Sequence, residues 1–226
     1  FRLGRALAKL GDYIEPVTLT TTTRRFFSIL SGMWPDAEQR DAMAALVSED
    51  AAESSRGAAI LSAIPVLNAV MRNGISPTKI FGGVAGNVIP AEVSAVLNVR
   101  TIPGFMVEDI VERMRQFVGD DAVEFTISSH GEEAPASDPD SDMFRSIAAS
   151  ASAIDPAITV VPYLSTGGTD SAHLRRIGID SYGVLPFPME QPDEERMHGH
   201  DERVPVKSLH FGTRLIYESV RRVASA

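Results

Sequence analysis

Hydrophobic positions recur at helical spacing over the first third of the chain. Leucines three and four residues apart predict an amphipathic helix over 1–12. The stretch 26–67 is rich in Ala, Glu and Met, which favours helices, and a Trp-Pro-Asp break lets Asp36 cap the second piece. The β-branched run 18–23 predicts a strand or an extended loop. This part of the chain is therefore predicted to be mainly helical.

The spacing changes to alternation further along. Residues 79–83 predict a strand that runs into a glycine turn, and 92–100 predict a clearer strand with one apolar face. Helical spacing returns over 107–117, and 123–129 alternates again. The resulting order is helix, helical insertion, strand, strand, helix, strand. It matches a ferredoxin-like β-α-β-β-α-β sandwich without its first strand.

A stretch rich in Pro, Asp and Ser, 134–142, predicts a domain boundary. Beyond it the patterns alternate between helix and strand, with helices over 143–153, 174–177 and 207–224 and strands over 159–163 and 182–185. Such alternation favours α/β layering. The sequence thus predicts two domains, 1–133 with a helical insertion at about 24–75, and 138–226.

Composition narrows the classes of function. The 226 residues carry a net charge of −9, which argues against a nucleic-acid partner. The chain has no cysteine, so disulfides and thiolate zinc sites are excluded and the cytoplasm is a compatible compartment. No apolar run approaches the roughly 18 residues of a membrane span. Because the first residue, Phe1, already lies in a helical pattern, we expect 1–226 to be a fragment of a longer polypeptide.

The segment His198-Gly199-His200-Asp201-Glu202 offers metal chemistry, because an imidazole flanked by carboxylates suits zinc. The alternative is a solvated loop with two incidental histidines. One such cluster does not hold a catalytic metal alone. Its partners therefore lie elsewhere, or the cluster has another role.

Two further segments suit ligand binding. Small residues around Gly168 and Thr169 follow a predicted strand and let a ligand approach the backbone, unless Thr169 or Asp170 simply caps the next helix. Asn87 lies in a glycine-rich turn, and Arg100 lies thirteen residues later. Arginine clamps carboxylates in bidentate fashion, although Arg100 also fits a surface charge on a sheet. The pair Glu132-Glu133 is interpreted as solvated charges.

Three segments, in this order, resemble the M20 family of zinc aminopeptidases, carboxypeptidases and aminoacylases. They are Gly83-Val84-Ala85-Gly86-Asn87-Val88-Ile89-Pro90 with Arg100, Gly168-Thr169-Asp170-Ser171, and His198-Gly199-His200-Asp201-Glu202-Arg203. The resemblance covers nearly the whole chain and corresponds to about the C-terminal half of the family's enzymes. It implies a ferredoxin-like lid with a helical insertion, followed by the C-terminal part of an α/β zinc-peptidase catalytic domain.

The resemblance also implies roles for individual residues. Family enzymes hold two zinc ions, and their lid mediates a homodimer. His198 would be the last zinc ligand, with His200 as its neighbour. Asn87 and Arg100 would hold the substrate carboxylate or the developing oxyanion, with an arrangement across the dimer left open. Gly168 and Thr169 would line the substrate pocket.

Parts of the family pattern are absent from 1–226. The family's other zinc ligands and its general base lie upstream of the lid, and Ala172 stands where an arginine often follows the Asp-Ser pair. We therefore expect no catalytic residue in this chain, no activity of the chain alone, and no retention of zinc. The intact enzyme would hydrolyse small peptides or N-acyl amino acids with a free carboxylate. The alternative is a non-catalytic dimerisation or ligand-binding module with a ferredoxin-like core.

Overall fold

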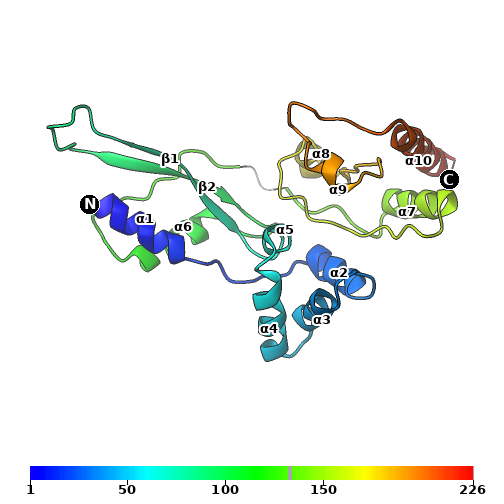
Figure 1. Cartoon of the computed structure of the whole chain (residues 1–226), viewed down its shortest axis with the longest axis horizontal. Helices are drawn as coiled ribbons and strands as arrows, with labels where there is room; N and C mark the ends of the chain where they lie inside the picture. Colours follow the sequence, from blue (N-terminus) through cyan, green and yellow to red (C-terminus); the bar gives the residue numbers. More distant parts are fainter. Residues whose placement is uncertain (132–133, 226) are drawn as a thin grey trace. The chain divides into compact units, whose positions relative to one another are not determined.

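The computed structural model describes residues 1–131 and 134–225, which divide into two compact units (Figure 1). Unit 1 comprises Phe1–Pro135 and Tyr163–Gly167, and unit 2 comprises Ala136–Pro162 and Gly168–Ala226. Helices and one small antiparallel sheet make the fold α+β, which agrees with the mixed α/β (α+β) class that the sequence indicates. The assignment of 1–133 to a lid and of 138–226 to a catalytic domain stays a prediction.

Two helices frame the start of unit 1. The predicted first helix is confirmed as α1 (Arg2–Asp12), which packs against α6 (Val107–Val118). Lys9 Nζ donates to the carbonyl of Val118 at 2.6 Å and ties the two helices together. The buried stripe of α6 ends at Val118, whereas Phe117 remains 45% exposed and its ring packs on Tyr13.

The sheet of unit 1 is a hairpin. Strand β1 (Gly74–Gly82) pairs antiparallel with β2 (Val93–Arg100), in a register that places Gly82 opposite Val93 and Gly74 opposite Arg100. Exposure alternates along β2, as the sequence predicts. The prediction of a third strand over 123–129 is wrong. Its alternate residues are half-buried, but within the described part of the chain it joins no ladder, and backbone pairing is what makes a strand.

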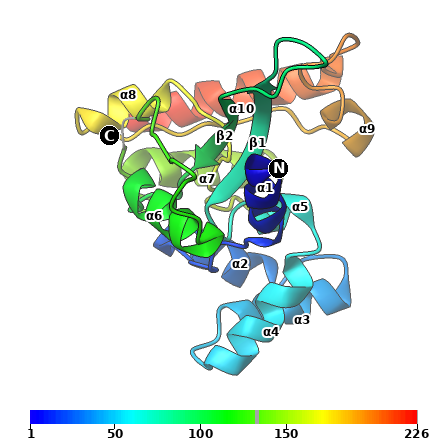
Figure 2. The ribbon, with the colours of Figure 1, turned by 90° about the vertical axis from the view of Figure 1, so that its left-hand side faces the viewer.

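The segment predicted to be a helical insertion forms helices α2 (Thr21–Leu30), α3 (Ala37–Leu46), α4 (Ala51–Leu61) and α5 (Pro65–Asn68). Asp36 caps α3 as predicted, because its carboxylate accepts from the Gln39 amide at 2.8 Å. The predicted strand or loop over 18–23 ends early, since Thr20 forms a capping box with Thr23 and starts α2. The insertion lies at the opposite end of unit 1 from the hairpin loop (Figure 1, Figure 2).

A buried polar cluster closes the base of the insertion. Glu15, 3% exposed, accepts two hydrogen bonds from Arg113 on α6, one from the Tyr13 hydroxyl and one from the Asn73 amide. Asn73 Oδ1 in turn accepts from the backbone amide of Ile102, just beyond β2. The cluster therefore joins both ends of the insertion to α6 and to the end of the sheet that carries Arg100.

Acid is expected to weaken this cluster. Burial disfavours the charged form of Glu15, but the hydrogen bonds from Arg113, Tyr13 and Asn73 outweigh burial, so the pKa of Glu15 lies below its ordinary value of 4.5. Because the folded pKa is the lower one, the stabilisation is complete above pH 4.5 and is lost as the pH falls through the folded pKa. We expect Glu15→Gln to cost about 3 kcal/mol at neutral pH.

Urea unfolding of the protein at a series of pH values measures this loss. The free-energy difference between wild type and Glu15→Gln should shrink as the pH is lowered below 4.5. Glu112→Gln is the control, since that side chain is half exposed and, among the residues described, pairs with Arg115 and Gln116 on its own helix. A difference that stays constant with pH would contradict the role assigned to Glu15.

Unit 2 is built on α7 (Asp142–Ile154) and α10 (Val206–Ala224), which pack together, with the shorter α8 (Ser171–Arg176) and α9 (Gln191–Glu194) between them in sequence. These helices confirm the predicted 143–153, 174–177 and 207–224. The sequence pattern also predicts a buried apolar stripe on this last helix, and that prediction is wrong apart from Leu215; the predicted members are Leu209, Leu215, Ile216, Val220 and Val223. The buried face is formed by Leu215 together with small residues, namely Ser208, Gly212 and Ser219.

The buried face of α10 is made of small residues because the Phe187 ring comes close to the helix backbone at Gly212. A Cβ atom on Gly212 would come within 2.6 Å of the Phe187 ring, so only glycine fits there. The remaining members of the predicted stripe are exposed, namely Leu209, Ile216, Val220 and Val223.

Neither strand predicted in unit 2 forms. In the part of the chain that the structure describes, 159–163 and 182–185 have no ladder partner. Side chains fix the second segment instead. The Ser137 hydroxyl bonds both backbone groups of Ser181 at 2.9 Å, and the Tyr182 ring packs on Phe144. Over the described ranges, no helix is long and apolar enough to cross a membrane.

Candidate functional site

The loop between β1 and β2 carries Asn87 at the tip of the hairpin. Gly83, with a φ of 82°, turns the chain out of β1, and the Val88 amide donates to the Ala85 carbonyl at 3.2 Å to close a turn around Asn87. Asn87 is exposed. Short local turns therefore present its amide at the far end of unit 1.

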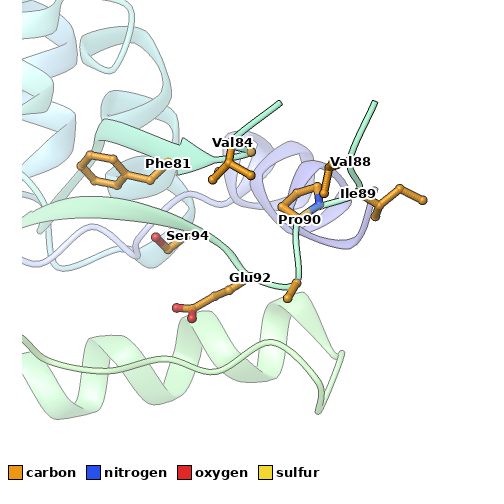
Figure 3. Close-up of a pocket in the computed structure, with 10 residues that line it drawn as sticks. Phe81, Val84, Val88, Ile89, Pro90, Glu92 and Ser94 are labelled. Carbon is orange, nitrogen blue, oxygen red and sulfur yellow. The ribbon is translucent and has the colours of Figure 1, made fainter. Parts of the chain in front are cut away.

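The same loop is strongly apolar. Val84 and Ile89 are 91% and 94% exposed. An open hollow of about 590 Å³ lies beside the loop, and Figure 3 shows the side chains around it. Its lining is apolar apart from one carboxylate and one hydroxyl, and consists of Phe81, Gly82, Gly83, Val84, Val88, Ile89, Pro90, Ala91, Glu92 and Ser94. Exposed apolar surface of this kind marks an interaction site.

Arg100 lies at the other end of β2 from this loop. It pairs with Gly74, and its Nη1 donates to the carbonyl of Thr166 at 2.6 Å. At roughly 3.3 Å per residue, the strand alone spans about 23 Å, and Asn87 lies beyond its start. One protomer therefore does not bring Asn87 and Arg100 to the same small molecule.

Gly168 and Thr169 lie on an exposed turn before α8. A Cβ on Gly168 would meet nothing within 4 Å, so close packing does not require glycine there. Asp170 stands at the N-cap of α8, but its side chain accepts no hydrogen bond from the helix. The alternative role for Thr169 or Asp170, that of a helix cap, is therefore not borne out by a side-chain hydrogen bond at this N-cap. The turn keeps its polar side chains exposed.

His198 lies on an exposed turn after α9 and has a φ of 64°. Positive φ is uncommon outside glycine and points to a local constraint. The turn is closed by the Gly199 amide, which donates to the Arg196 carbonyl at 2.8 Å. Among the residues that the structure describes, the imidazole of His198 has no hydrogen-bond partner. It is therefore available as a ligand.

The carboxylate next to this turn has another role. Asp201 forms ion pairs with Arg196 and, at 3.3 Å, with Arg203, which also binds Asp193 at 2.8 Å. The pKa of Arg203 is raised by its hydrogen bond with Asp193. Asp201 therefore braces the segment between α9 and α10.

The described residues do not assemble a metal site by themselves. Within 1–131 and 134–225, no three His, Asp or Glu side chains come together as a ligand group. His198 fits the role of a single ligand, but the residues present do not fit a dinuclear centre. Glu132 and Glu133, interpreted above as solvated charges, lie outside the described residues.

Two features of the site have no local sequence signal. The bond from Arg100 to Thr166 joins residues 66 positions apart, and the pair of Glu15 and Arg113 joins residues 98 apart. No spacing rule for helices or strands reaches that far. An alignment that showed covariation would be the signal able to find them.

A family model described as a peptidase dimerisation domain matches residues 3–126, more than half of the chain. A probable carboxypeptidase S-like protein of Dictyostelium discoideum is 31% identical over 150 residues, which cover 66% of this chain and 29% of that protein. The human N-fatty-acyl-amino acid synthase/hydrolase is 27% identical over 160 residues, 70% of this chain and 32% of that protein.

Aminoacylase-1B of Rattus norvegicus is 28% identical over 149 residues, 63% of this chain and 36% of that protein. The chain thus spans about a third of the length of these relatives. Among solved structures, an M20 family metallo-carboxypeptidase of Sulfolobus solfataricus matches with a TM-score of 0.55 at 15% identity, over 97% of this chain and 51% of that one. At this identity the likeness concerns the fold alone.

Proposed function

The chain belongs to the M20 family of metallopeptidases, and from this premise we propose that it forms the lid and the end of the catalytic domain of a di-zinc amidohydrolase. The match of the peptidase dimerisation domain to residues 3–126 is the observation that carries the proposal. The proposed reaction is hydrolysis of a peptide or N-acyl bond in a small substrate with a free carboxylate. The proposed compartment is the cytoplasm.

The substrate class follows from chemistry that the relatives share. They are named as a carboxypeptidase-like protein, an N-fatty-acyl-amino acid hydrolase and an aminoacylase. An amide bond beside a free α-carboxylate is common to the substrates that these names describe. A site for such substrates needs a cation for the carboxylate, and Arg100 offers a planar guanidinium with five donors.

Each candidate residue has a proposed role. Arg100 binds the substrate carboxylate, and the amide of Asn87 donates to the developing oxyanion. Gly168 and Thr169 line the pocket. His198 supplies one ligand to a site with two zinc ions, whose other ligands and whose catalytic groups lie outside 1–226. Bound zinc would polarise the scissile carbonyl and lower the pKa of its water. The isolated chain is accordingly proposed to be inactive and to retain no zinc.

The separation of Asn87 and Arg100 supports a dimeric site. About 23 Å of strand lies between them, so one substrate meets both residues only if they come from two subunits. We propose a homodimer formed through the lid, in which Asn87 of one subunit and Arg100 of the other face the same substrate. The exposed side chains of Val84 and Ile89 beside Asn87 suit burial at such a contact.

Mixing of inactive subunits tests this arrangement. In the full-length protein, Asn87→Ala and Arg100→Ala should each abolish most hydrolysis of an N-acyl amino acid. A mixed dimer would contain one site with both residues intact. An equal mixture, after exchange of subunits, should therefore regain about a quarter of wild-type activity.

The activity of the mixture depends on whether the Asn87 and Arg100 of one site come from one subunit or from two. If Asn87 and Arg100 of one subunit served the same site, every site in a mixed dimer would carry one substitution. The mixture would then stay as inactive as its parents, and the dimeric site would be refuted. Mixing two preparations of the Asn87→Ala variant is the control, because it regains nothing under either arrangement.

A further inference from the structure

Unit 1 contains a short segment that belongs, along the chain, to the second half of the protein. This segment, Tyr163–Gly167, is named the strap below. In the sequence, the strap comes after one stretch of unit 2, Ala136–Pro162, and before the other, Gly168–Ala226. The residues that follow it directly are Gly168 and Thr169. The contacts that hold the strap on unit 1 therefore restrain the first residues of the proposed pocket loop.

The first anchor of the strap is a pair of aromatic rings. Tyr163 packs on Phe26 of α2, with ring centroids 5.5 Å apart and planes tilted by 56°. Phe26 is 8% exposed and packs edge-on against Phe27, which is fully buried. Tyr163 itself is half exposed, and its ring rests on the buried side chain of Phe26. Tilted ring pairs of this kind add to stability beyond the area they bury.

The second anchor is the bond from Arg100 to the Thr166 carbonyl at 2.6 Å, a charge-assisted hydrogen bond. Arg100 is held in turn by the sheet, and the Ile102 amide two residues later is bonded to Asn73 of the buried cluster. The two anchors lie three residues apart in the strap. Together they fix both its position and its direction.

We infer that Phe26, Tyr163 and Arg100 are positioning residues, which hold the strap on unit 1 and thereby limit the motion of the residues that follow it directly, Gly168 and Thr169. The inference rests on the proposed function, because it takes this loop as part of the substrate pocket. It gives the helical insertion a specific role, since Phe26 on α2 supports the strap. The bond to Thr166 uses one of five guanidinium donors, so Arg100 keeps enough donors for a carboxylate.

Amide hydrogen exchange in the full-length protein tests the strap without reference to activity. Tyr163→Leu and Phe26→Leu should each speed exchange at residues 164–169 about threefold to tenfold, the range expected when a ring pair is lost. Tyr163→Phe keeps the ring on Phe26 and should speed exchange less than Tyr163→Leu does. The double variant should exceed neither single variant, because each already breaks the same pair.

Phe117→Leu is the matched control. It breaks the ring pair with Tyr13, which has centroids 4.9 Å apart, elsewhere in unit 1. It should leave exchange at 164–169 unchanged. Unchanged rates in Tyr163→Leu, or the same increase in Phe117→Leu, would overturn the inference.

Kinetics separate the strap from a merely structural role. With N-acetyl-L-phenylalanine as the probe, Tyr163→Leu should raise KM about threefold to tenfold and change kcat less than about twofold, since the loop holds substrate and does not react. A threefold to tenfold fall in kcat with an unchanged KM would overturn the assignment. If the wild-type protein hydrolyses no N-acyl amino acid, the proposed function fails, and the exchange rates still decide whether the strap exists.

Discussion

Replacing His198 by glycine in the full-length protein is expected to lower kcat/KM for an N-acyl amino acid about a thousandfold. Loss of an outer-shell partner of a metal ligand typically costs about tenfold to a hundredfold, and loss of the ligand itself should cost more. Glycine suits the position because it adopts the φ of 64° without strain. The substitution therefore removes the imidazole and leaves the turn intact.

His200→Ala is the control for His198→Gly. Both histidines are exposed and lie on the same turn, two residues apart. The ligand assignment predicts that His200→Ala keeps activity within about tenfold of wild type, the lower range for a neighbour of the site. Thermal unfolding should be similar for both variants. Equal losses of activity in the two variants would contradict the assignment of the ligand to His198.

Replacing Arg100 by alanine is expected to raise KM about a hundredfold or more for substrates with a free carboxylate. Truncating one partner of a hydrogen-bonded charge pair typically costs about 2–5 kcal/mol, and a factor of ten corresponds to about 1.4 kcal/mol. Arg100→Lys keeps the charge but loses the planar fork. It should recover only part of the loss.

The substrate supplies the control for Arg100. Wild-type protein should prefer an N-acyl amino acid over the corresponding primary amide, and Arg100→Ala should lose that preference. Tyr163→Leu loosens the strap without touching the carboxylate, so it should keep the preference. A preference that survives in Arg100→Ala would show that another cation binds the carboxylate, and the role proposed for Arg100 would be wrong.

Local patterns predicted the helices well because the forces that form them are local. Helical spacing located α1, α6 and α10, and a single carboxylate at Asp36 marked the start of α3. Their buried faces were less predictable. The face of α10 is set by the close approach of Gly212 to Phe187, a contact between distant residues that no periodicity contains.

Strands were predicted only where a neighbour lay close in sequence. Strands β1 and β2 find each other across one loop, so the sequence pattern was enough to locate β2 and the second half of β1. The segments 123–129, 159–163 and 182–185 carry similar patterns and form no ladder in the described ranges. A strand depends on backbone partners, and the pattern of a single segment does not say whether those partners are present.

In the candidate site, too, local motifs were visible in the sequence and contacts between distant residues were not. Motifs that are contiguous in sequence drew attention to Asn87, Arg100, Gly168, Thr169 and His198 through a family resemblance. The buried cluster at Glu15 and the strap at Tyr163 did not stand out, because all the contacts given for them, apart from the bond between Tyr13 and Glu15 and that between Asn73 and Ile102, join residues 57 or more positions apart. Such contacts follow from the fold and become visible only in it.

Zinc content tests the central claim most directly. Full-length wild-type protein, His198→Gly and His200→Ala would be purified without chelators, and bound zinc would be counted by elemental analysis. The account predicts two zinc ions per subunit in wild type and in His200→Ala, and fewer in His198→Gly. Two zinc ions retained by His198→Gly, or none bound by wild type, would contradict it.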